Sequence, residues 1–443
     1  MAHDELNRLT ATAAADAIRR GDITSEALVG ACLDRIGARE PEVGAFIHLD
    51  PAHALSAARA ADEARRQGLS TGPLHGVPVA IKDVIDTADY PTEHGSAAFP
   101  GNQPEADAAC VAALRAAGAI ILGKTVTTEL AARCPGKTRN PHHLAHTPGG
   151  SSSGSAAAVA DAMVPLALGT QTGGSVIRPA SFCGIYGYKP TFGLIPRPGV
   201  LTQSHSLDTV GVMARSLEDL ALAGDVLAGH DGRDASSLVV SAGRLAETAR
   251  MDWPVEPTFA FVKSPAWAGA DPAMHEAFGE LAEALGARLV EVDINLAIER
   301  GVAAARVVQM VELAHHFGPL FDRTPNLVSP QLIEMIEEGR SARAIDYAAA
   351  LDARQALYGV VEELFYTHGP ILTPASPGRA PLGLTTTGDP VFNAFWTYLG
   401  VPCVTLPLLE AEGLPIGVQL VGARRDDGRL LRTARLLVAE LAT

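Results

Sequence analysis

Residues 147–155 read TPGGSSSGS and residues 170–175 read TQTGGS, and these two stretches decide how the whole chain is interpreted. Glycines allow the main chain to approach a ligand closely and to adopt positive φ angles. The N–H groups of such a bare backbone can point at a developing negative charge. Because both stretches also carry serine hydroxyls, they predict a site that binds an oxyanion and attacks with a serine.

Three explanations compete for these two loops. A flexible linker would not be flanked by apolar strands and by a small-residue helix, which we expect over residues 155–163. A phosphate-binding loop would need GxxxxGK[ST], or GxGxxG after a strand, and neither is present. A serine hydrolase fits best, although the G-x-S-x-G elbow has only a formal match in the first loop, with no strand leading directly into it. No histidine is obviously placed as its base.

Outward from the loops, short apolar runs alternate with helical stretches. This alternation is typical of βα units around a largely buried mixed sheet, so the sequence predicts an α/β fold. We divide the chain into an N-terminal helical segment (1–70) and a main domain (70–443). Within the main domain, residues from about 230 to 365 look mainly helical and are expected to cap the site. The predicted strands cover residues 77–81, 119–124, 164–169, 259–262, 288–292 and 370–373.

Lys82 closes the first of these apolar runs, where a charged ammonium would be poorly solvated. Desolvation lowers the pKa of a lysine, so a buried Lys82 would be a usable base near neutral pH. The alternative is a lysine at a strand end that reaches solvent or pairs with Asp83 or Asp86. The local sequence on its own favours that alternative.

Composition limits the other classes of function. The chain has 443 residues, of which 47% are hydrophobic and 19% charged, so it can bury a large core. Its net charge of −15, with both signs interspersed, argues against nucleic-acid or membrane partners. The 5 cysteines are scattered without CxxC spacing, which favours a reducing compartment. With no signal-peptide pattern, we expect a cytoplasmic protein.

Several spaced motifs resemble the amidase signature family. The resemblance implies that family's fold, a mixed sheet of many strands with helices on both faces, and a hydrolase of linear amides, that is, of C–N bonds other than peptide bonds. It implies no metal and no cofactor, a small-molecule partner, and a homodimer as a common assembly among relatives. The motifs are GVPVAIKD at 76–83, GGSSSG at 149–154, GGS at 173–175, FCG at 182–184, KPT at 189–191, LTP at 372–374, GVP at 400–402 and GLPIGVQ at 413–419.

The resemblance also assigns roles to residues. The family's Ser–cis-Ser–Lys triad falls on Ser175 as nucleophile, Ser151 as proton relay and Lys82 as neutral base. Ser151 is expected in a cis peptide after Gly150. Thr172, Gly173, Gly174 and Ser175 would supply the oxyanion hole through their N–H groups, and Gly149 and Gly150 would border the substrate. Ser152 is expected to support this network, and Ser153 and Ser155 to cap the following helix.

The substrate depends on Arg178, which lies three residues after Ser175. The run GSVIRP at 174–179, with KDVIDT at 82–87 and PTE at 91–93, is similar to the malonamidase-like branch of the family. There the corresponding arginine binds a substrate carboxylate, which suits a guanidinium fork and implies a malonamate-like acidic amide. Alternatively Arg178 is structural and pairs with a buried acid or carbonyl. Aryl amides, anilides and carbamates such as urethanes then remain as substrates.

Two functions from other classes remain as rivals. One is the amidase-like subunit of a tRNA-dependent amidotransferase, which normally carries a helical tyrosine-rich stretch late in the chain, and we find none here. The other is a non-catalytic binding protein on the same scaffold. The joint presence of Lys82, Ser151 and Ser175 argues against the second rival.

Overall fold

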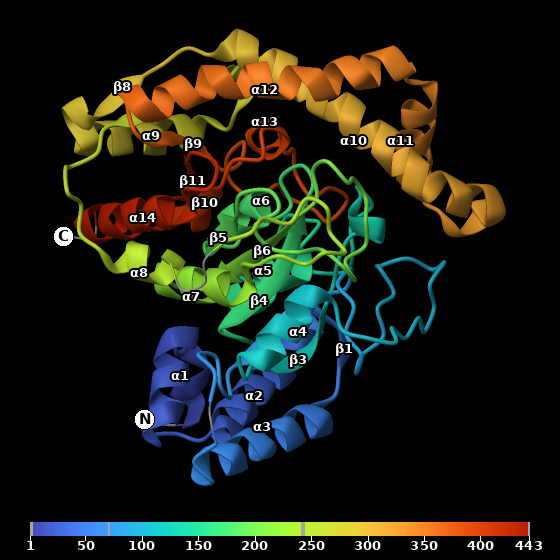
Figure 1. The fold of residues 1–443 in the computed structure, drawn as a ribbon, viewed down its shortest axis with the longest axis vertical. Coiled ribbons are helices and arrows are strands. Elements are labelled where there is room, and N and C mark those ends of the chain that lie inside the picture. The colour runs from blue at the N-terminus through green and yellow to red at the C-terminus, as the bar shows by residue number, and fades with distance from the viewer. Residues whose placement is uncertain (1–2, 70, 241–243, 442–443) are drawn as a thin grey trace.

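The computed structural model describes residues 3–69, 71–240 and 244–441. Their centre is an 11-stranded sheet with the order β1-β3-β2-β4-β6-β5-β10-β11-β9-β7-β8 (Figure 1). Its strands are β1 (Phe46–Leu49), β2 (Pro78–Lys82), β3 (Ile120–Thr125), β4 (Leu166–Gln171), β5 (Tyr186–Lys189), β6 (Thr209–Ala214), β7 (Phe259–Phe261), β8 (Leu289–Glu291), β9 (Ile371–Pro374), β10 (Cys403–Ala411) and β11 (Leu414–Val421).

The predicted α/β fold with a mixed sheet is confirmed. β2 runs parallel to both β3 and β4, and β7 runs parallel to β8 and β9, whereas the remaining neighbours are antiparallel. The six predicted strands correspond to β2, β3, β4, β7, β8 and β9. The remaining strands, β1, β5, β6, β10 and β11, were not predicted, and they join or extend the βα units.

Helices surround this sheet. Thr10 and Thr24 cap the first two long helices, because their side chains accept hydrogen bonds from the N–H groups of Ala13 and Ala27. The helices are α1 (Ala11–Arg20), α2 (Ser25–Val43), α3 (Pro51–Arg66), α4 (Ala109–Ala116), α5 (Ser153–Ala160), α6 (Ile177–Phe182), α7 (Leu217–Leu227), α8 (Arg244–Arg250), α9 (Pro272–Leu285), α10 (Asn295–Arg323), α11 (Pro330–Ser341), α12 (Ala344–Thr367), α13 (Ala394–Tyr398) and α14 (Asp427–Leu441).

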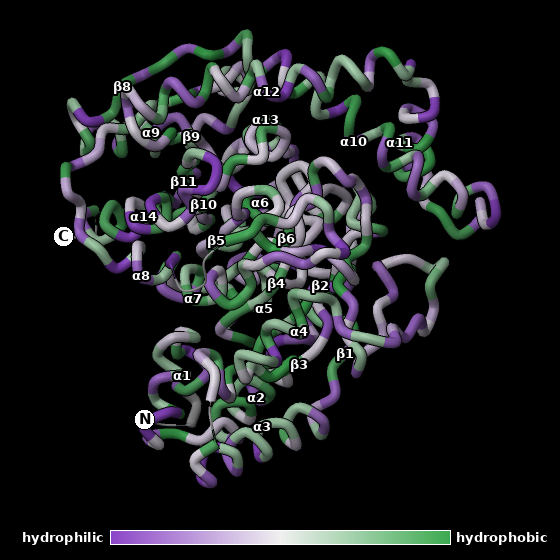
Figure 2. The backbone as a smooth tube through the Cα atoms, viewed as in Figure 1, coloured by the Kyte–Doolittle hydropathy of each residue, from purple (hydrophilic) through white to green (hydrophobic). Residues whose placement is uncertain are grey.

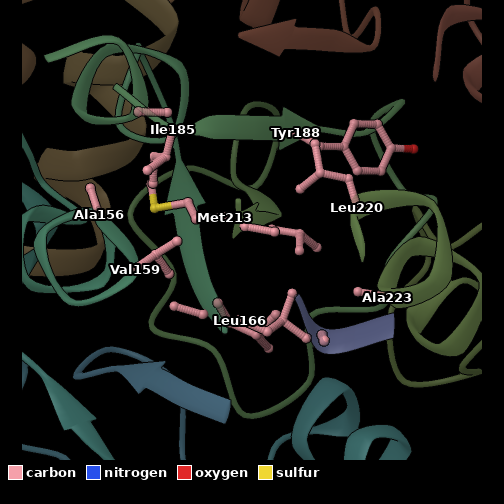
Figure 3. Packing of buried hydrophobic residues seen from close by; sticks show 14 of the residues in the cluster. Ala156, Val159, Leu166, Ile185, Tyr188, Met213, Leu220 and Ala223 are labelled. Carbon is pink, nitrogen blue, oxygen red and sulfur yellow. The ribbon is translucent and has the colours of Figure 1, made fainter. Parts of the chain in front are cut away.

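Both faces of the sheet are covered, because alternate residues of a strand point to opposite sides. On β5 a side chain at Gly187 would meet Ala180 of α6, whereas the next residue, Tyr188, packs against Gly224 of α7. Figure 3 shows the same division, with Met213 beside Ala156 and Val159 of α5 and with Tyr188 beside Leu220 and Ala223 of α7. In Figure 2 the apolar colour gathers on the central strands and on the sheet-facing sides of the helices.

The described part of the N-terminal segment is mainly helical, as predicted, but it also contributes a strand. β1 pairs with β3, so this segment forms one edge of the sheet. Helices α10, α11 and α12 of the middle region lie together along the upper part of the view in Figure 1. α10 packs against α11, α12 and α13. No helix within the described ranges is long and apolar enough to cross a membrane.

The packing of α10 against α13 leads to a prediction about stability. A methyl group added to Gly301 of α10 would lie 2.3 Å from Phe395 Cδ2, and Phe395 is held against Trp396 with a centroid distance of 4.9 Å. We expect Gly301→Ala to lower the free energy of unfolding by about 1–3 kcal/mol through overpacking. In the matched control Gly359→Ala of α12, the added methyl group meets nothing within 4 Å, and helix propensity should raise stability by about 1 kcal/mol. Urea unfolding measures both, and equal effects would contradict the packing argument.

Candidate active site

Lys82 is the last residue of β2, and its ammonium group lies at the carboxyl edge of the parallel β2–β4 pair. The Nζ atom lies 2.7 Å from Ser151 Oγ and 2.7 Å from Thr170 Oγ1. Lys82 is fully buried. The alternative of a strand-end lysine that reaches solvent or pairs with Asp83 or Asp86 is therefore wrong. Asp83 instead faces Lys124, with 3.5 Å between Oδ1 and Nζ.

The electrostatic environment disfavours a charged Lys82. Burial lowers its pKa well below the ordinary lysine value, and the positive charge of Arg178 lowers it further. The carboxylate of Asp208 acts in the opposite direction and raises the pKa of Lys82. The balance keeps the pKa of Lys82 depressed, so the amine can accept a proton from a neighbouring hydroxyl.

The first glycine-serine loop brings Ser151 to Lys82. The peptide bond between Gly150 and Ser151 is cis, as expected from the resemblance. The hydroxyl of Ser152 lies under this loop, where it donates to the Thr170 carbonyl and accepts from the Thr170 N–H, each at 3.2 Å. Ser152 thus connects the first glycine-serine loop to Thr170 at the end of β4, and the hydroxyl of the same threonine contacts Lys82.

Glycine is required at both positions before Ser151. A side chain at Gly149, whose φ is 85°, would lie 2.8 Å from Pro179 Cα. One at Gly150 would lie 2.7 Å from Thr387 Cγ2. The loop therefore packs tightly against Pro179 of α6 and against Thr387.

The predicted caps of the following helix are wrong. Ser152 is the N-cap residue of α5, and it makes no side-chain capping bond. Ser153 and Ser155 lie inside the helix and donate instead to the carbonyls of Val126 and Leu168, at 3.3 and 2.9 Å. These hydroxyls anchor α5 to the neighbouring chain segments because small side chains allow close approach there.

The second loop joins β4 to α6 and carries Ser175, which is partly exposed. The Gln171 side chain closes this loop, since its Oε1 accepts from the N–H groups of Val176 and Ile177 at 2.8 and 3.0 Å. Thr397 Oγ1 donates to the Gly173 carbonyl at 2.6 Å. Within the described residues, none of the N–H groups of residues 172–175 donates to a protein acceptor. A loop with fixed carbonyls and unused N–H groups has the chemistry of an oxyanion hole.

Asp208 joins the second loop to the neighbouring strand β6. Its Oδ1 accepts from Thr172 Oγ1 at 2.5 Å, and its Oδ2 accepts from the N–H groups of Gln203 and Ser204, each at 2.8 Å. Burial raises the pKa of Asp208 to about 6 despite these donors. Asp208 was not predicted from the sequence, because it lies in no motif and reaches the site only through the pairing of β4 with β6.

A second buried carboxylate, Glu312 of α10, joins the helical cap to the same region. It accepts hydrogen bonds from the Ser204 hydroxyl, from Ser206 Oγ at 2.6 Å and from the Tyr347 hydroxyl of α12 at 2.7 Å. Ser204 also donates its N–H to Asp208. Helices α10 and α12 are therefore connected through these two carboxylates to the loop of residues 172–175.

Arg178 is buried, and most of its guanidinium is occupied. Nε donates to the Thr387 carbonyl at 2.8 Å, and Nη2 donates to the Gly150 carbonyl at 2.7 Å. Nη1 is buried and has no partner among the described residues. Burial lowers the pKa of Arg178 to about 10, and the charge of Asp389 opposes this shift. The side chain thus holds the carbonyl of the cis peptide that precedes Ser151.

A buried lysine hydrogen-bonded to a serine therefore lies next to a loop whose N–H groups have no protein acceptor among the described residues. The comparisons with known proteins identify the family. The family described as Amidase matches residues 27–431. The chain therefore belongs to the amidase family, and its fold is that of solved amidases.

Individual relatives show the spread of functions on this fold. A glutamyl-tRNA(Gln) amidotransferase component from Chloroflexus aurantiacus is 37% identical over 475 aligned positions, which cover 97% of this chain and 96% of the relative. Peptide amidase from Stenotrophomonas maltophilia has a TM-score of 0.83 at 28% identity, covering 98% and 97%. A structure described as a vestigial protein complex that reveals the origins of an s-triazine catabolic enzyme has a TM-score of 0.90 at 29% identity, covering 97% and 98%.

The depressed pKa of Lys82 generates a prediction that needs no substrate. At pH values between the pKa of Lys82 in the folded chain and the ordinary lysine pKa, the unfolded chain binds more protons at this residue than the folded chain does. The free energy of unfolding of the wild type should therefore rise with pH relative to Lys82→Met, by up to about 1.4 kcal/mol per pH unit. Urea unfolding between pH 6 and 9 measures this slope. Ser151→Ala keeps the buried amine and should keep the slope, whereas parallel wild-type and Lys82→Met profiles would contradict the depressed pKa.

Proposed function

We propose that this protein is an amidase that hydrolyses the C–N acyl bond of a small amide or carbamate through an acyl-enzyme on Ser175. The observation that carries this proposal is the buried Lys82 amine, 2.7 Å from the Ser151 hydroxyl. A neutral lysine in contact with a serine is a base and relay that needs no histidine. The family membership supports the same reaction class.

The proposed reaction has two halves. Ser175 Oγ attacks the carbonyl carbon while its proton passes to Ser151, and the Ser151 proton passes to Lys82 Nζ. The N–H groups of residues 172–175 receive the negative charge of the tetrahedral intermediate, where each such donor contributes about 3–4 kcal/mol. The proton then returns through Ser151 to the departing amine. Water attacks the acyl-enzyme by the same route and releases the acid.

The contacts of Arg178 bear on the choice of substrate. A clamp for a malonamate-like carboxylate needs two free, parallel N–H groups on two different guanidinium nitrogens. Here Nε and Nη2 bond to protein oxygens, and Nη1 is buried. These contacts support the structural role of Arg178, in which it orients the carbonyl of Gly150. We therefore favour neutral amides, including aryl amides, anilides and carbamates, over acidic ones.

A second candidate is the amidase-like component of a tRNA-dependent amidotransferase, because relatives with such names match nearly the whole chain. Their alignment runs over 475 positions, more than the 443 residues of this chain, so these relatives carry segments that this chain lacks. Glutamine hydrolysis together with co-purification of a second protein of that assembly would establish the role. Turnover of simple amides by the isolated chain, without glutamine hydrolysis, would exclude it.

Replacement of the proposed nucleophile tests the reaction directly. Ser175→Ala should reduce amide hydrolysis by at least about 10³-fold, because no acyl-enzyme can form without the hydroxyl. Mass spectrometry after exposure to an activated ester should show acylation of the wild type and none of the variant. Ser153→Ala is the matched control, since that hydroxyl donates to the Val126 carbonyl. Normal turnover by Ser175→Ala would overturn the assignment.

The charge of Asp208 predicts a pH shift of defined sign. Its carboxylate raises the pKa of Lys82, so Asp208→Asn should lower that pKa further. Because the proposed base works as the neutral amine, the acid limb of kcat/KM should move to lower pH. Thr172→Val removes the hydroxyl donor but keeps the carboxylate, so its acid limb should stay close to that of the wild type. A shift of Asp208→Asn to higher pH would contradict Lys82 as the base.

A further inference from the structure

An apolar pocket of about 310 Å³ lies between α10 and two loops of the main domain. Ile298 and Val302 form its α10 side, and Pro265 and Ala266, from the loop after β7, form the opposite side. Val391 completes the wall from the loop before α13. Since one water occupies about 30 Å³ of liquid, the volume equals that of about ten waters. An aromatic ring or a branched alkyl group with a short linker fits such a space.

The loop that carries Val391 also borders the proposed oxyanion hole. A side chain at Gly173 would lie 3.7 Å from Cβ of Pro390, the residue next to Val391. Two residues further on, Asn393 lies against Gly174, because a side chain there would meet Asn393 Oδ1 at 2.4 Å. One short segment, residues 390–393, therefore contacts the second glycine-serine loop and also contributes a wall residue to the pocket.

Two charged residues line the pocket, and they select the kind of group that it accepts. Arg306 is one of them, but its guanidinium donates to both carboxylate oxygens of Glu338 at 2.5 Å. Glu299 is the other charged lining residue, and it is acidic. A substrate carboxylate would find no unpaired basic group among the described lining residues of this pocket. An uncharged apolar group gains from burial against the aliphatic walls.

We propose that this pocket is a specificity subsite that receives an aryl or branched alkyl group of a neutral amide substrate. The proposal rests on the amidase function proposed above and adds the substrate class to it. Val302 and Val391 are then specificity-determining residues from two segments that lie 89 positions apart in the chain. The helical middle region contributes to substrate choice through α10.

Substrate pairs that differ only in the apolar group test this inference. We compare kcat/KM for phenylacetamide with that for acetamide, and for acetanilide with that for acetamide. The wild type should prefer at least one apolar member of these pairs. Val302→Lys should lower that preference by about tenfold or more, as expected for loss of an apolar subsite, while acetamide turnover stays within about twofold. Leu296→Lys is the matched control, because Leu296 lies on the same helix, is 62% exposed and does not line the pocket.

The outcomes separate the subsite from the reaction itself. Equal loss on apolar and small amides in Val302→Lys, or an unchanged preference, would overturn the subsite while leaving the amidase function in place. A wild type that turns over none of these amides would overturn the proposed function. Calorimetry then tests the subsite without turnover, by comparing the binding of phenylacetamide to Ser175→Ala with its binding to the same variant that also carries Val302→Lys. Binding that is about tenfold weaker in the double variant supports the subsite, and equal binding overturns it.

Discussion

A buried lysine whose amine contacts hydroxyls rather than a carboxylate is the constraint on which the rest of the site depends. Lys82 is placed by β2, and its amine lies between the hydroxyls of Ser151 and Thr170. Such an environment solvates an ammonium ion poorly, so the neutral amine is favoured. The parallel pairing of β2 with β4 brings these groups to one sheet edge, because parallel strands end on the same side. The sheet thus determines the position of the Lys82 amine, and the burial that comes with this position lowers its pKa.

The carboxylates around the site affect the pKa of Lys82 without forming an ion pair with its amine. Asp208 is close enough to raise the pKa of Lys82, yet its oxygens are bonded to Thr172, Gln203 and Ser204. A direct ion pair would restore the ammonium and remove the base. Glu312 holds Ser204 from the other side and so connects the cap helices to the same carboxylate. The position of the cap and the electrostatics of the base are therefore coupled through one loop.

Patterns within short stretches of the sequence predicted several strands, but not the contacts between distant segments. The apolar runs located β2, β3 and β4, because this signal acts within a few residues. The local sequence around Lys82 favoured a lysine at the surface, and the role of a base came only from the resemblance of several spaced motifs to the amidase signature family. Asp208 and Glu312 carried no signal, since their positions depend on strand pairing and on helix packing between distant segments. The caps predicted at Ser153 and Ser155 were wrong because tertiary partners took those hydroxyls.

The same distinction explains why signature motifs determine a reaction more closely than a substrate. Lys82 ends β2, and the two glycine-serine loops lie beside it at the same edge of the sheet, so the sheet determines the spacing of these groups. Arg178 lies in α6, directly after the second loop, and its bonds to Gly150 and Thr387 make it part of the scaffold of the site. The apolar walls beyond Pro390 come instead from α10, from the loop after β7 and from residue 391, which no single motif spans. Substitution in those walls can change the substrate without disturbing Lys82, which is how one sheet can carry hydrolases with different substrates.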